Sequence, residues 1–312
     1  MIARRLLVSI PLLFAMSFVV FSLVTLIPGD AATTIAGGND ASPETIAEIR
    51  EELNLNDPFL VQYGTWLKGA VQLDFGSSLY TKRPVSEELI ERLPATTSLA
   101  AAVFAIVIPL SMLFGILGGL RPGGLLDRGL MFSTSVVVAM PPFWIGMVLI
   151  SIFSVRLGWL PPYGYTPFSE DPLGWFTGII MPAVALAAAG VAIVSRQLRA
   201  GLTDTMGSPF VRTAWAKGGD TRQVVVGHAL KNSAIPAVTV LGILVGSILG
   251  STVIVERIFS IPGVGTYIIV AVGNMDVPAI QATVLLFVVA HCIANLIVDI
   301  TYGYLNPKVR AA

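Results

Sequence analysis

Long apolar runs separated by polar stretches set the pattern along this chain. Six runs are long enough to cross a lipid bilayer as helices, which takes about 20 residues. We expect them at roughly 7–27, 95–120, 129–155, 178–195, 234–255 and 279–302. The fourth is the shortest and is rich in Ala and Gly, so we expect it to pack inside the bundle. The pattern predicts an all-α, polytopic membrane protein.

The first run has a second interpretation, because Arg4 and Arg5 precede it as in a secretory signal peptide. Its apolar stretch from Leu6 to Ile27 exceeds the roughly 7–15 residues of a signal-peptide core. We therefore expect a retained membrane anchor.

Composition supports the membrane class. The 312 residues are 54% hydrophobic and 12% charged, and the mean hydropathy is +0.80, whereas soluble domains carry about 25% charged residues. The net charge of zero says nothing about partners. One cysteine, Cys292, forms no internal disulfide, and His228 and His291 are too far apart in sequence to suggest a metal site.

The distribution of charge predicts the orientation. With six spans both ends lie on one side, and most of the 19 Lys and Arg residues fall in loops on that side. Positive charge is retained in the cytoplasm, so we expect cytoplasmic termini and a multi-pass protein.

The loop of about residues 28–94, between the first two runs, is predicted to be folded and extracytoplasmic. Ser42-Pro43 is typical of a helix start, and apolar residues then recur at helical spacing from Phe59 to Val71. The loop either caps the bundle or docks an extracytoplasmic partner, and both can hold.

Prolines interrupt several runs, at Pro109, Pro141-Pro142, Pro182 and Pro236. Each removes a backbone donor, and such breaks survive in a membrane where neighbours or water satisfy the freed groups. They indicate either a pathway with moving helices or the ordinary frequency of proline in membrane helices.

A polar, basic stretch between the fourth and fifth runs has a helical pattern of its own. Ser208-Pro209 predicts a helix start, and Gly218-Gly219 predict its end. Asp220 with Gln223 three residues on predicts a capping box and a second helix that runs toward Asn232.

The first of these helices has about nine residues, too few to be stable alone in water. Phe210, Val211, Ala214 and Trp215 lie close to one face. A short helix that carries aromatic residues is suited to a groove of another protein. The basic loop can also simply obey the positive-inside rule, place Trp215 at the membrane interface, or lie flat on the membrane.

Residues "FVRTAWAKG" (210–218) and "HALKNSAIP" (228–236) resemble the cytoplasmic coupling-loop motif of ABC-transporter permeases, in particular those of the dipeptide/oligopeptide/nickel importer family. Further resemblances follow in order along the chain, and together they cover nearly all of it. They are "LDFGSSLYTKRPV" (73–85), "LGWLPPYG" (157–164), "VERIFSIPGVG" (255–265) and "DITYGYLNPKVR" (299–310).

The resemblance implies the type I ABC importer permease fold with six transmembrane helices. It implies an anchor and extracytoplasmic helical loop at 1–94 and a permease core at 95–312, with the cytoplasmic coupling loop at about 196–233. The residues implied to contact an ATPase are Ser208, Phe210, Arg212, Ala214, Trp215, Lys217 and Gly218.

The resemblance also implies the partners: a second homologous permease chain, two cytoplasmic ATPase subunits that bind ATP and Mg, and an extracytoplasmic substrate-binding protein. The expected location is the bacterial inner membrane with its lipid, the solute is a peptide, and no nucleic acid is expected. The chain departs from the family pattern at Trp215, Gly219 and Asn306, where a basic residue, an apolar residue and an aspartate are usual.

The chain has no G-x-x-x-x-G-K-[ST] motif, no HExxH and no nucleophile elbow, so we expect a non-catalytic subunit without a cofactor of its own. An ion-coupled secondary transporter is a competing hypothesis, but it typically needs charged residues near the membrane midplane. Here Asp299 is the one candidate and lies near the end of a run. The pattern also leaves open a receptor or scaffold that passes no solute, and a nickel-chelate importer of the same family.

Overall fold

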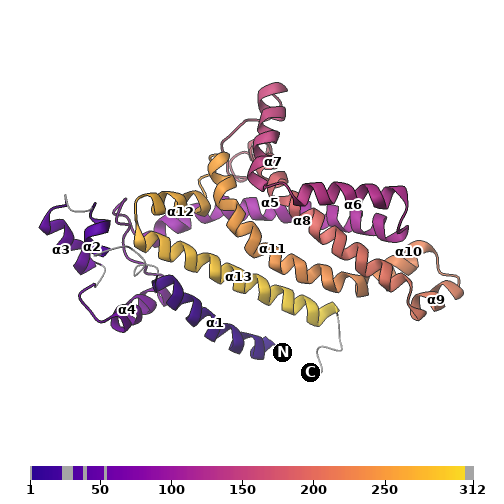
Figure 1. Ribbon diagram of the computed structural model, residues 1–312, viewed down its shortest axis with the longest axis horizontal. Helices are drawn as coiled ribbons and strands as arrows, with labels where there is room; N and C mark the ends of the chain where they lie inside the picture. Colours follow the sequence, from indigo (N-terminus) through magenta and orange to yellow (C-terminus); the bar gives the residue numbers. More distant parts are fainter. Residues whose placement is uncertain (1, 23–30, 38–40, 53–54, 306–312) are drawn as a thin grey trace. The chain divides into compact units, whose positions relative to one another are not determined.

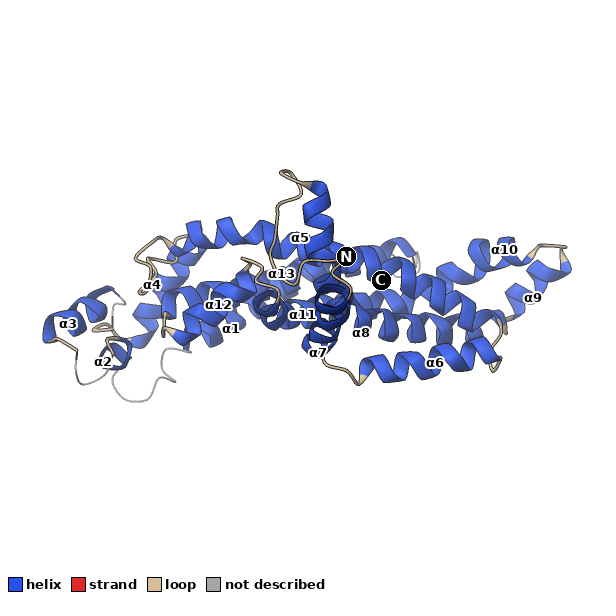
Figure 2. Ribbon diagram, turned by 90° about the horizontal axis from the view of Figure 1, so that it is seen from above, coloured by secondary structure: helices blue, strands red, loops and turns tan. Residues whose placement is uncertain are grey.

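The computed structural model describes all residues except 1, 23–30, 38–40, 53–54 and 306–312. Figures 1 and 2 show that the described residues form helices joined by loops. Their only strand-like pairing is an isolated bridge between Ser77 and Pro84. The helices are α1 (Ile2–Ser22), α2 (Ala31–Ile35), α3 (Pro43–Glu52), α4 (Phe59–Val71), α5 (Val85–Leu120), α6 (Leu125–Val138), α7 (Pro142–Leu149), the π-helical η2 (Ile150–Arg156), α8 (Pro172–Met206), α9 (Pro209–Ala216), α10 (Thr221–Val224), the π-helical η3 (Val225–Ala229), α11 (Leu230–Ile258), α12 (Val264–Gly273) and α13 (Val277–Leu305).

Four stretches of the described chain are long and apolar enough to cross a membrane: α5, α8, α10 with η3 and α11, and the part of α13 up to Val298. A fifth candidate is the pair formed by α6 and α7 with η2, which bends by 100°. The run expected at 7–27 is only partly described, as a helix that ends at Ser22. The all-helical membrane fold is therefore confirmed, and the count of six spans stays a prediction.

The prolines act differently from one another. Pro141 and Pro142 lie at the bend between α6 and α7, where Pro142 opens α7 and needs no helical donor. The expected break does occur there, so the run at 129–155 is not one straight helix. Pro182 and Pro236, in contrast, lie inside α8 and α11, which continue past them.

The chain forms two compact units by its internal contacts. Unit 1 contains residues 1–2, 95–265 and 293–312, and unit 2 contains residues 3–94 and 266–292. The expected division into residues 1–94 and 95–312 concerns folding domains rather than contacts, and it stays a prediction.

Helix α8 is the centre of unit 1. In the most apolar 18-residue stretch of α8, 61% of the residues are buried, against 28% in the corresponding stretches of α5 and of α10 to α11. It packs against α6, α7 and α11, and α11 lies beside it in Figure 1. Gly190 shows why small residues are needed there, since a Cβ would lie 3.1 Å from a methyl of Val107 on α5. The prediction of an inner, small-residue helix is confirmed.

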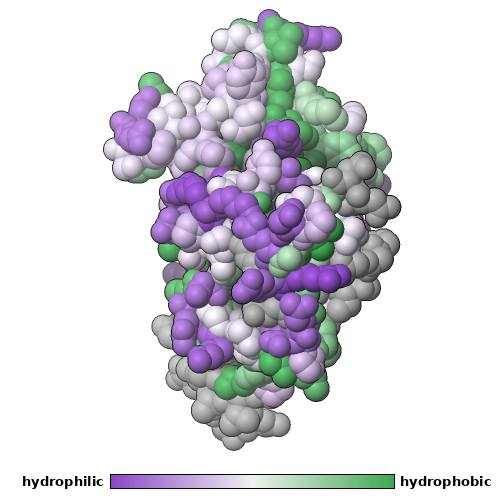
Figure 3. Space-filling view, turned by 90° about the vertical axis from the view of Figure 1, so that its left-hand side faces the viewer, coloured by the Kyte–Doolittle hydropathy of each residue, from purple (hydrophilic) through white to green (hydrophobic). Residues whose placement is uncertain are grey.

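Unit 2 contains the loop that is predicted to be folded, and its helices α2, α3 and α4 confirm that prediction. The Ser42 hydroxyl accepts a hydrogen bond from the Thr45 backbone N–H at 3.1 Å, as an N-cap residue does. Figure 3 looks onto the side where α2 and α3 lie, and hydrophilic side chains cover much of that face. Exposed charged residues of α3 and α4 include Glu44, Glu48 and Lys68.

Candidate functional site

Helix α9 begins at Pro209, after Ser208 in an extended conformation. The predicted start is therefore in the right place, but Ser208 does not cap the helix with its side chain. Its hydroxyl donates instead to the Thr205 carbonyl at 2.6 Å, at the end of α8. The consequence is a tight two-residue connection between α8 and α9.

The end of α9 agrees with the prediction for its glycines. Gly218 has φ of +82°, in the left-handed region that favours glycine, and its N–H donates to the Trp215 carbonyl at 2.9 Å. Gly219 lies where a Cβ would approach the Ala214 carbonyl to 3.1 Å and Val224 to 3.2 Å. The departure from the family pattern at Gly219 thus fits the close approach of the chain at this turn.

A small apolar cluster holds α9 in place. Val211 of α9 is fully buried and packs with Leu202 of α8, Val224 of α10, and Val225 and Ala229 of η3. Partly buried apolar residues surround this cluster, namely Ile116, Leu120, Met206 and Ala214. The support that a helix of this length requires therefore comes from this chain's own α5, α8 and η3.

The predicted apolar face of α9 divides into two parts. Val211 and Ala214 turn toward the cluster, whereas Phe210 is 45% exposed and Trp215 is 39% exposed. Arg212, Lys217 and Gly218 are also exposed, and Ser208 is half-buried. The structure thus places all seven predicted contact residues on one short segment, with an aromatic and basic surface left open. Their contact with an ATPase stays a prediction.

The predicted capping box is present at the start of α10. The Gln223 backbone N–H donates to Asp220 Oδ1 at 2.6 Å, and the Asp220 N–H donates to Gln223 Oε1 at 3.3 Å. Beyond it the helix is π-helical over η3 before α11 begins, so the predicted second helix leads directly into the long apolar helix. α10 and η3 both pack against α9.

The motif at 255–265 folds around a buried carboxylate in unit 1. Glu256, at the end of α11, accepts a hydrogen bond from the Thr96 hydroxyl at 2.7 Å, and that hydroxyl accepts one from the Val264 N–H at 2.8 Å. A side chain at Gly263 would collide with the carboxylate, and one at Gly265 would lie 2.7 Å from Val253 Cα. Close packing therefore requires glycine at these two positions of the motif. The hydrogen bonds through Thr96 connect the end of α11 and the start of α12 to α5.

Aromatic rings join α1 and α4 within unit 2. Phe59 and Tyr63 of α4 each contact Phe18 and Phe21 of α1, with ring centroids 5.2–5.7 Å apart. Trp66 contacts Phe21 as well, at 5.6 Å. The helical spacing seen in the sequence thus marks a packing face between the loop and the first helix.

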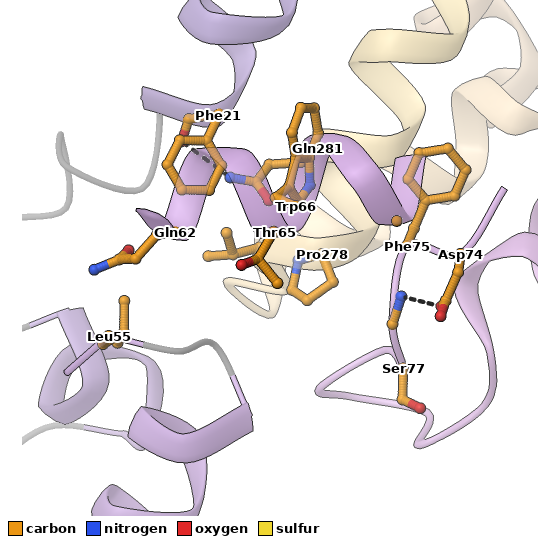
Figure 4. A pocket seen from close by; sticks show the side chains of 13 residues that line it. Phe21, Leu55, Gln62, Thr65, Trp66, Asp74, Phe75, Ser77, Pro278 and Gln281 are labelled. Carbon is orange, nitrogen blue, oxygen red and sulfur yellow. Dashed lines mark hydrogen bonds between the residues drawn. The ribbon is translucent and has the colours of Figure 1, made fainter. Parts of the chain in front are cut away.

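A pocket of about 240 Å³ lies in unit 2, beside Trp66 and the start of α13 (Figure 4). Gln281 donates to the Phe21 carbonyl at 3.0 Å on one side of it, and Asp74 accepts from the Gly76 N–H at 3.0 Å on the other. The buried indole N–H of Trp66 has no hydrogen-bond partner among the described residues. Residues 23–30 and 53–54, which adjoin this region in sequence, lie outside the described residues.

Two buried acids organise the rest of unit 2. The Tyr267 hydroxyl donates to Glu88 at 2.8 Å, and burial raises the pKa of the Tyr267 phenol above its ordinary range, with the Glu88 contact adding to it. Asp276 accepts from the Ser78 hydroxyl and from the Leu79 N–H, the latter at 3.1 Å. Asp276 thus fixes residues 78 and 79 of the motif at 73–85, and the Thr81 hydroxyl of the same motif donates to Glu88 at 3.1 Å.

Within the described residues no group of three or more His, Cys, Asp or Glu side chains is placed to hold a metal ion. Cys292 is partly buried. The side chain of Asp299 and all of Asn306 lie outside what the structure describes.

Sequence reasoning finds α9 and its exposed residues but misses what supports them. Leu202, Val224 and Ala229 are unremarkable apolar residues in the sequence, and only the fold brings them to Val211. It also misses the ion pair between Asp127 and Arg199, which are 72 positions apart and look in the sequence like ordinary loop charges.

Two family models match the chain. Residues 108–311 match the binding-protein-dependent transport system inner membrane component, and residues 1–100 match the N-terminal part of the binding-protein-dependent transport system membrane component.

Relatives match over nearly the full length. The dipeptide transport system permease protein DppB of Alkalihalophilus pseudofirmus is 38% identical over 330 residues, which covers 98% of each chain. The glutathione transport system permease protein GsiC of Escherichia coli K12 is 36% identical over 309 residues, covering 99% of this chain and 98% of that one. A chain of Brucella abortus (strain 2308) that is named for a peptide transport system is 37% identical over 310 residues, with 99% and 98% covered.

Proposed function

Because the chain belongs to the family of inner membrane components of binding-protein-dependent transport systems, we propose that it is the permease subunit of an ATP-driven importer of peptides. It forms half of a translocation pathway through the bacterial inner membrane. The names of its relatives, for dipeptides, glutathione and peptides, support a peptide as the solute.

The observation that carries the proposal is the exposed surface of α9. Phe210 and Trp215 remain open on a helix that Val211 anchors firmly to its own chain. Aromatic residues with arginine are the side chains that most often dominate a protein interface. An anchored helix with such a surface is suited to the groove of an ATPase subunit.

The proposed assembly has this chain paired with a second, homologous permease, with one ATPase subunit below each. The ATPases bind ATP and Mg, and this chain catalyses no reaction. Both termini and the 196–233 loop face the cytoplasm, in keeping with the basic residues of that loop. An extracytoplasmic binding protein delivers the peptide from the other side.

In this assembly ATP drives transport through a change of conformation. ATP binding closes the two ATPases, carries α9 with them, and turns the pathway from inward-facing to outward-facing. ATP shifts such an equilibrium only by binding the two states differently. A shift from 1:99 to 99:1 requires about 5.5 kcal/mol of differential affinity, so α9 must stay attached to the ATPase in both states.

The test is reconstitution of the chain in proteoliposomes with its partner permease, ATPases and binding protein. We expect uptake of a labelled dipeptide that requires ATP, and a crosslink from a Trp215→Cys variant to the ATPase. Uptake driven by an ion gradient without ATP would establish a secondary transporter instead. Uptake of a nickel chelate in place of a peptide would make the chain a nickel-chelate importer of the same family.

A further inference from the structure

A buried carboxylate at the start of α6 forms a bidentate ion pair with an arginine of α8. Asp127 is 3% exposed. Arg199 donates to it through Nε and also through Nη2, the latter at 2.6 Å from Oδ2. A third donor, the Gly123 N–H, lies 2.8 Å from the same Oδ2. A two-pronged ion pair fixes the orientation of both groups as well as their distance, so the turn that joins α5 to α6 is tied to α8.

The same part of α8 packs closely against the end of α5. A Cβ at Gly118 would lie 3.2 Å from Asp127 Oδ1 and 3.3 Å from Arg199 Cδ. A Cβ at Gly119 would lie 2.9 Å from Leu202 Cδ2. The two glycines therefore let α5 lie against the ion pair and against Leu202 without a gap.

Leu202 links this region to α9. It follows Arg199 by less than one helical turn, is fully buried, and packs in the cluster that contains Val211. The contacts are thus continuous from α9 through Leu202 to α5, and from Arg199 through Asp127 to α6. Close-packed side chains are not freely deformable, so a displacement of α9 would have to be accommodated along this path.

We propose that Arg199 is a positioning residue for transport, whose bidentate ion pair with Asp127 makes the α5–α6 turn move together with α9. The inference rests on the proposed function, in which an ATPase moves α9. It goes further because it names the contact by which that movement reaches α5 and α6.

The chemistry of the pair favours this role over a purely stabilising one. Asp127 is buried and the Arg199 side chain is 25% exposed, and an ion pair of this kind contributes little net stability, because the cost of removing charge from water offsets the attraction. Two apolar side chains would hold α6 to α8 as firmly, but they can slide and repack, whereas a forked pair holds one register. We therefore expect a side chain that fixes the register of α6 against α8 to affect the coupling of ATP hydrolysis to import more than the assembly of the complex.

The test compares coupling in variants of the reconstituted complex. Arg199→Lys keeps the positive charge but not the fork, and Asp127→Asn removes the negative charge. We measure capture of the ATPases, ATP hydrolysis, and peptide molecules imported per ATP hydrolysed. We expect both variants to capture the ATPases and hydrolyse ATP, and the ratio of import to hydrolysis to fall at least fivefold. The exchange Asp127→Arg with Arg199→Asp should recover part of that ratio.

Arg128→Lys is the matched control, since Arg128 is exposed and adjoins Asp127 in sequence, and it should leave the ratio unchanged. An Arg199→Lys complex that assembles and imports peptide at the ratio of the unaltered complex overturns the inference. So does an exchange variant that assembles and does no better than Asp127→Asn. If the unaltered complex shows no ATP-dependent uptake, the proposed function fails instead, which is a separate result.

Discussion

Helices α4 and α9 are both short helices in connecting segments, and they use their aromatic residues in opposite ways. In α4, Phe59 and Tyr63 contact the rings of α1, which lie in the same unit. In α9, neither Phe210 nor Trp215 contacts another aromatic ring within the described chain, and both are partly exposed. The aliphatic Val211 is the residue that anchors α9.

The difference distinguishes aromatic residues that pack within the chain, in α4, from aromatic residues that are available to contact a partner, in α9. The outward surface of α4 carries aliphatic Leu60 and Val61, whereas that of α9 carries a phenylalanine, a tryptophan and basic residues. Aromatic residues and arginine are enriched in protein interfaces relative to the rest of the surface. We therefore expect changes on the two sides of α9 to have different effects, and changes in α4 to affect stability alone.

The largest effect should follow from Val211→Asp. This change buries a carboxylate in an apolar cluster, which should destabilise the packing of α9 by about 3 kcal/mol or more. Transport should be lost, and limited proteolysis should cut the 208–220 segment. Val211→Ala leaves a cavity instead and should cost about 2 kcal/mol.

Thr213→Asp is the matched control, because Thr213 is exposed on the same helix and a carboxylate there stays in water. If Val211→Asp and Thr213→Asp were cut by the protease at the same rate, the cluster would not be what holds α9.

The second effect is on binding rather than on folding. Replacing Phe210 and Trp215 together by alanine should weaken capture of the ATPase by about 2 kcal/mol, or roughly 30-fold in Kd, as for central aromatic residues of an interface. The melting temperature of the isolated permease should not change. Phe132→Ala, at an exposed aromatic residue of α6, is the control and should bind as before. Equal Kd values for the double variant and the control would mean that the partner does not use this surface.

The elements of α9 are predictable because local chemistry determines them. Proline at the first turn, glycine at a left-handed residue and an Asp–Gln capping box each leave a signal within a few residues of sequence. Which apolar residues of α9 are buried and which are exposed is not predictable, because Val211 and Trp215 lie one turn apart and are both apolar. Which of them is buried depends on Leu202 and Val224, which arrive from other helices.

Among the spans, length and hydropathy locate the long helices well, and the small residues of α8 correctly indicate its inner position. The effect of each proline cannot be read from sequence. Pro142 stands at the first turn of α7, where a missing N–H costs nothing, whereas Pro182 lies inside α8 and is tolerated by its neighbours. The pairing of Asp127 with Arg199 is also hidden, since sequence separation carries no distance information.

A smaller effect should follow from Gly218→Val. Apart from the neighbouring residues in the chain, no described atom lies within 4 Å of the position that a Cβ would take, so the cost comes from the left-handed backbone, about 1–2 kcal/mol. The valine should turn the chain out of this conformation and redirect the end of α9, which lowers peptide import per ATP hydrolysed while the protein still inserts. Gly218→Asn is the control, because asparagine tolerates this conformation. Normal coupling in the valine variant would count against the importance of this helix end.

The smallest effect should follow from Tyr63→Phe in α4. The change removes the hydrogen bond between the Tyr63 hydroxyl and Ser17 Oγ, 2.9 Å apart, and the longer contact of that hydroxyl with the Phe14 carbonyl at 3.4 Å, but keeps the ring against Phe18 and Phe21. One such bond contributes about 1 kcal/mol, so thermal unfolding in detergent should occur slightly earlier, while ATPase capture and peptide import stay unchanged. A double-mutant cycle with Ser17→Ala isolates the pair, because the two single losses should then fail to add. Reduced ATPase capture in this variant would show that the aromatic residues of α4 and α9 do not have the separate roles that their packing indicates.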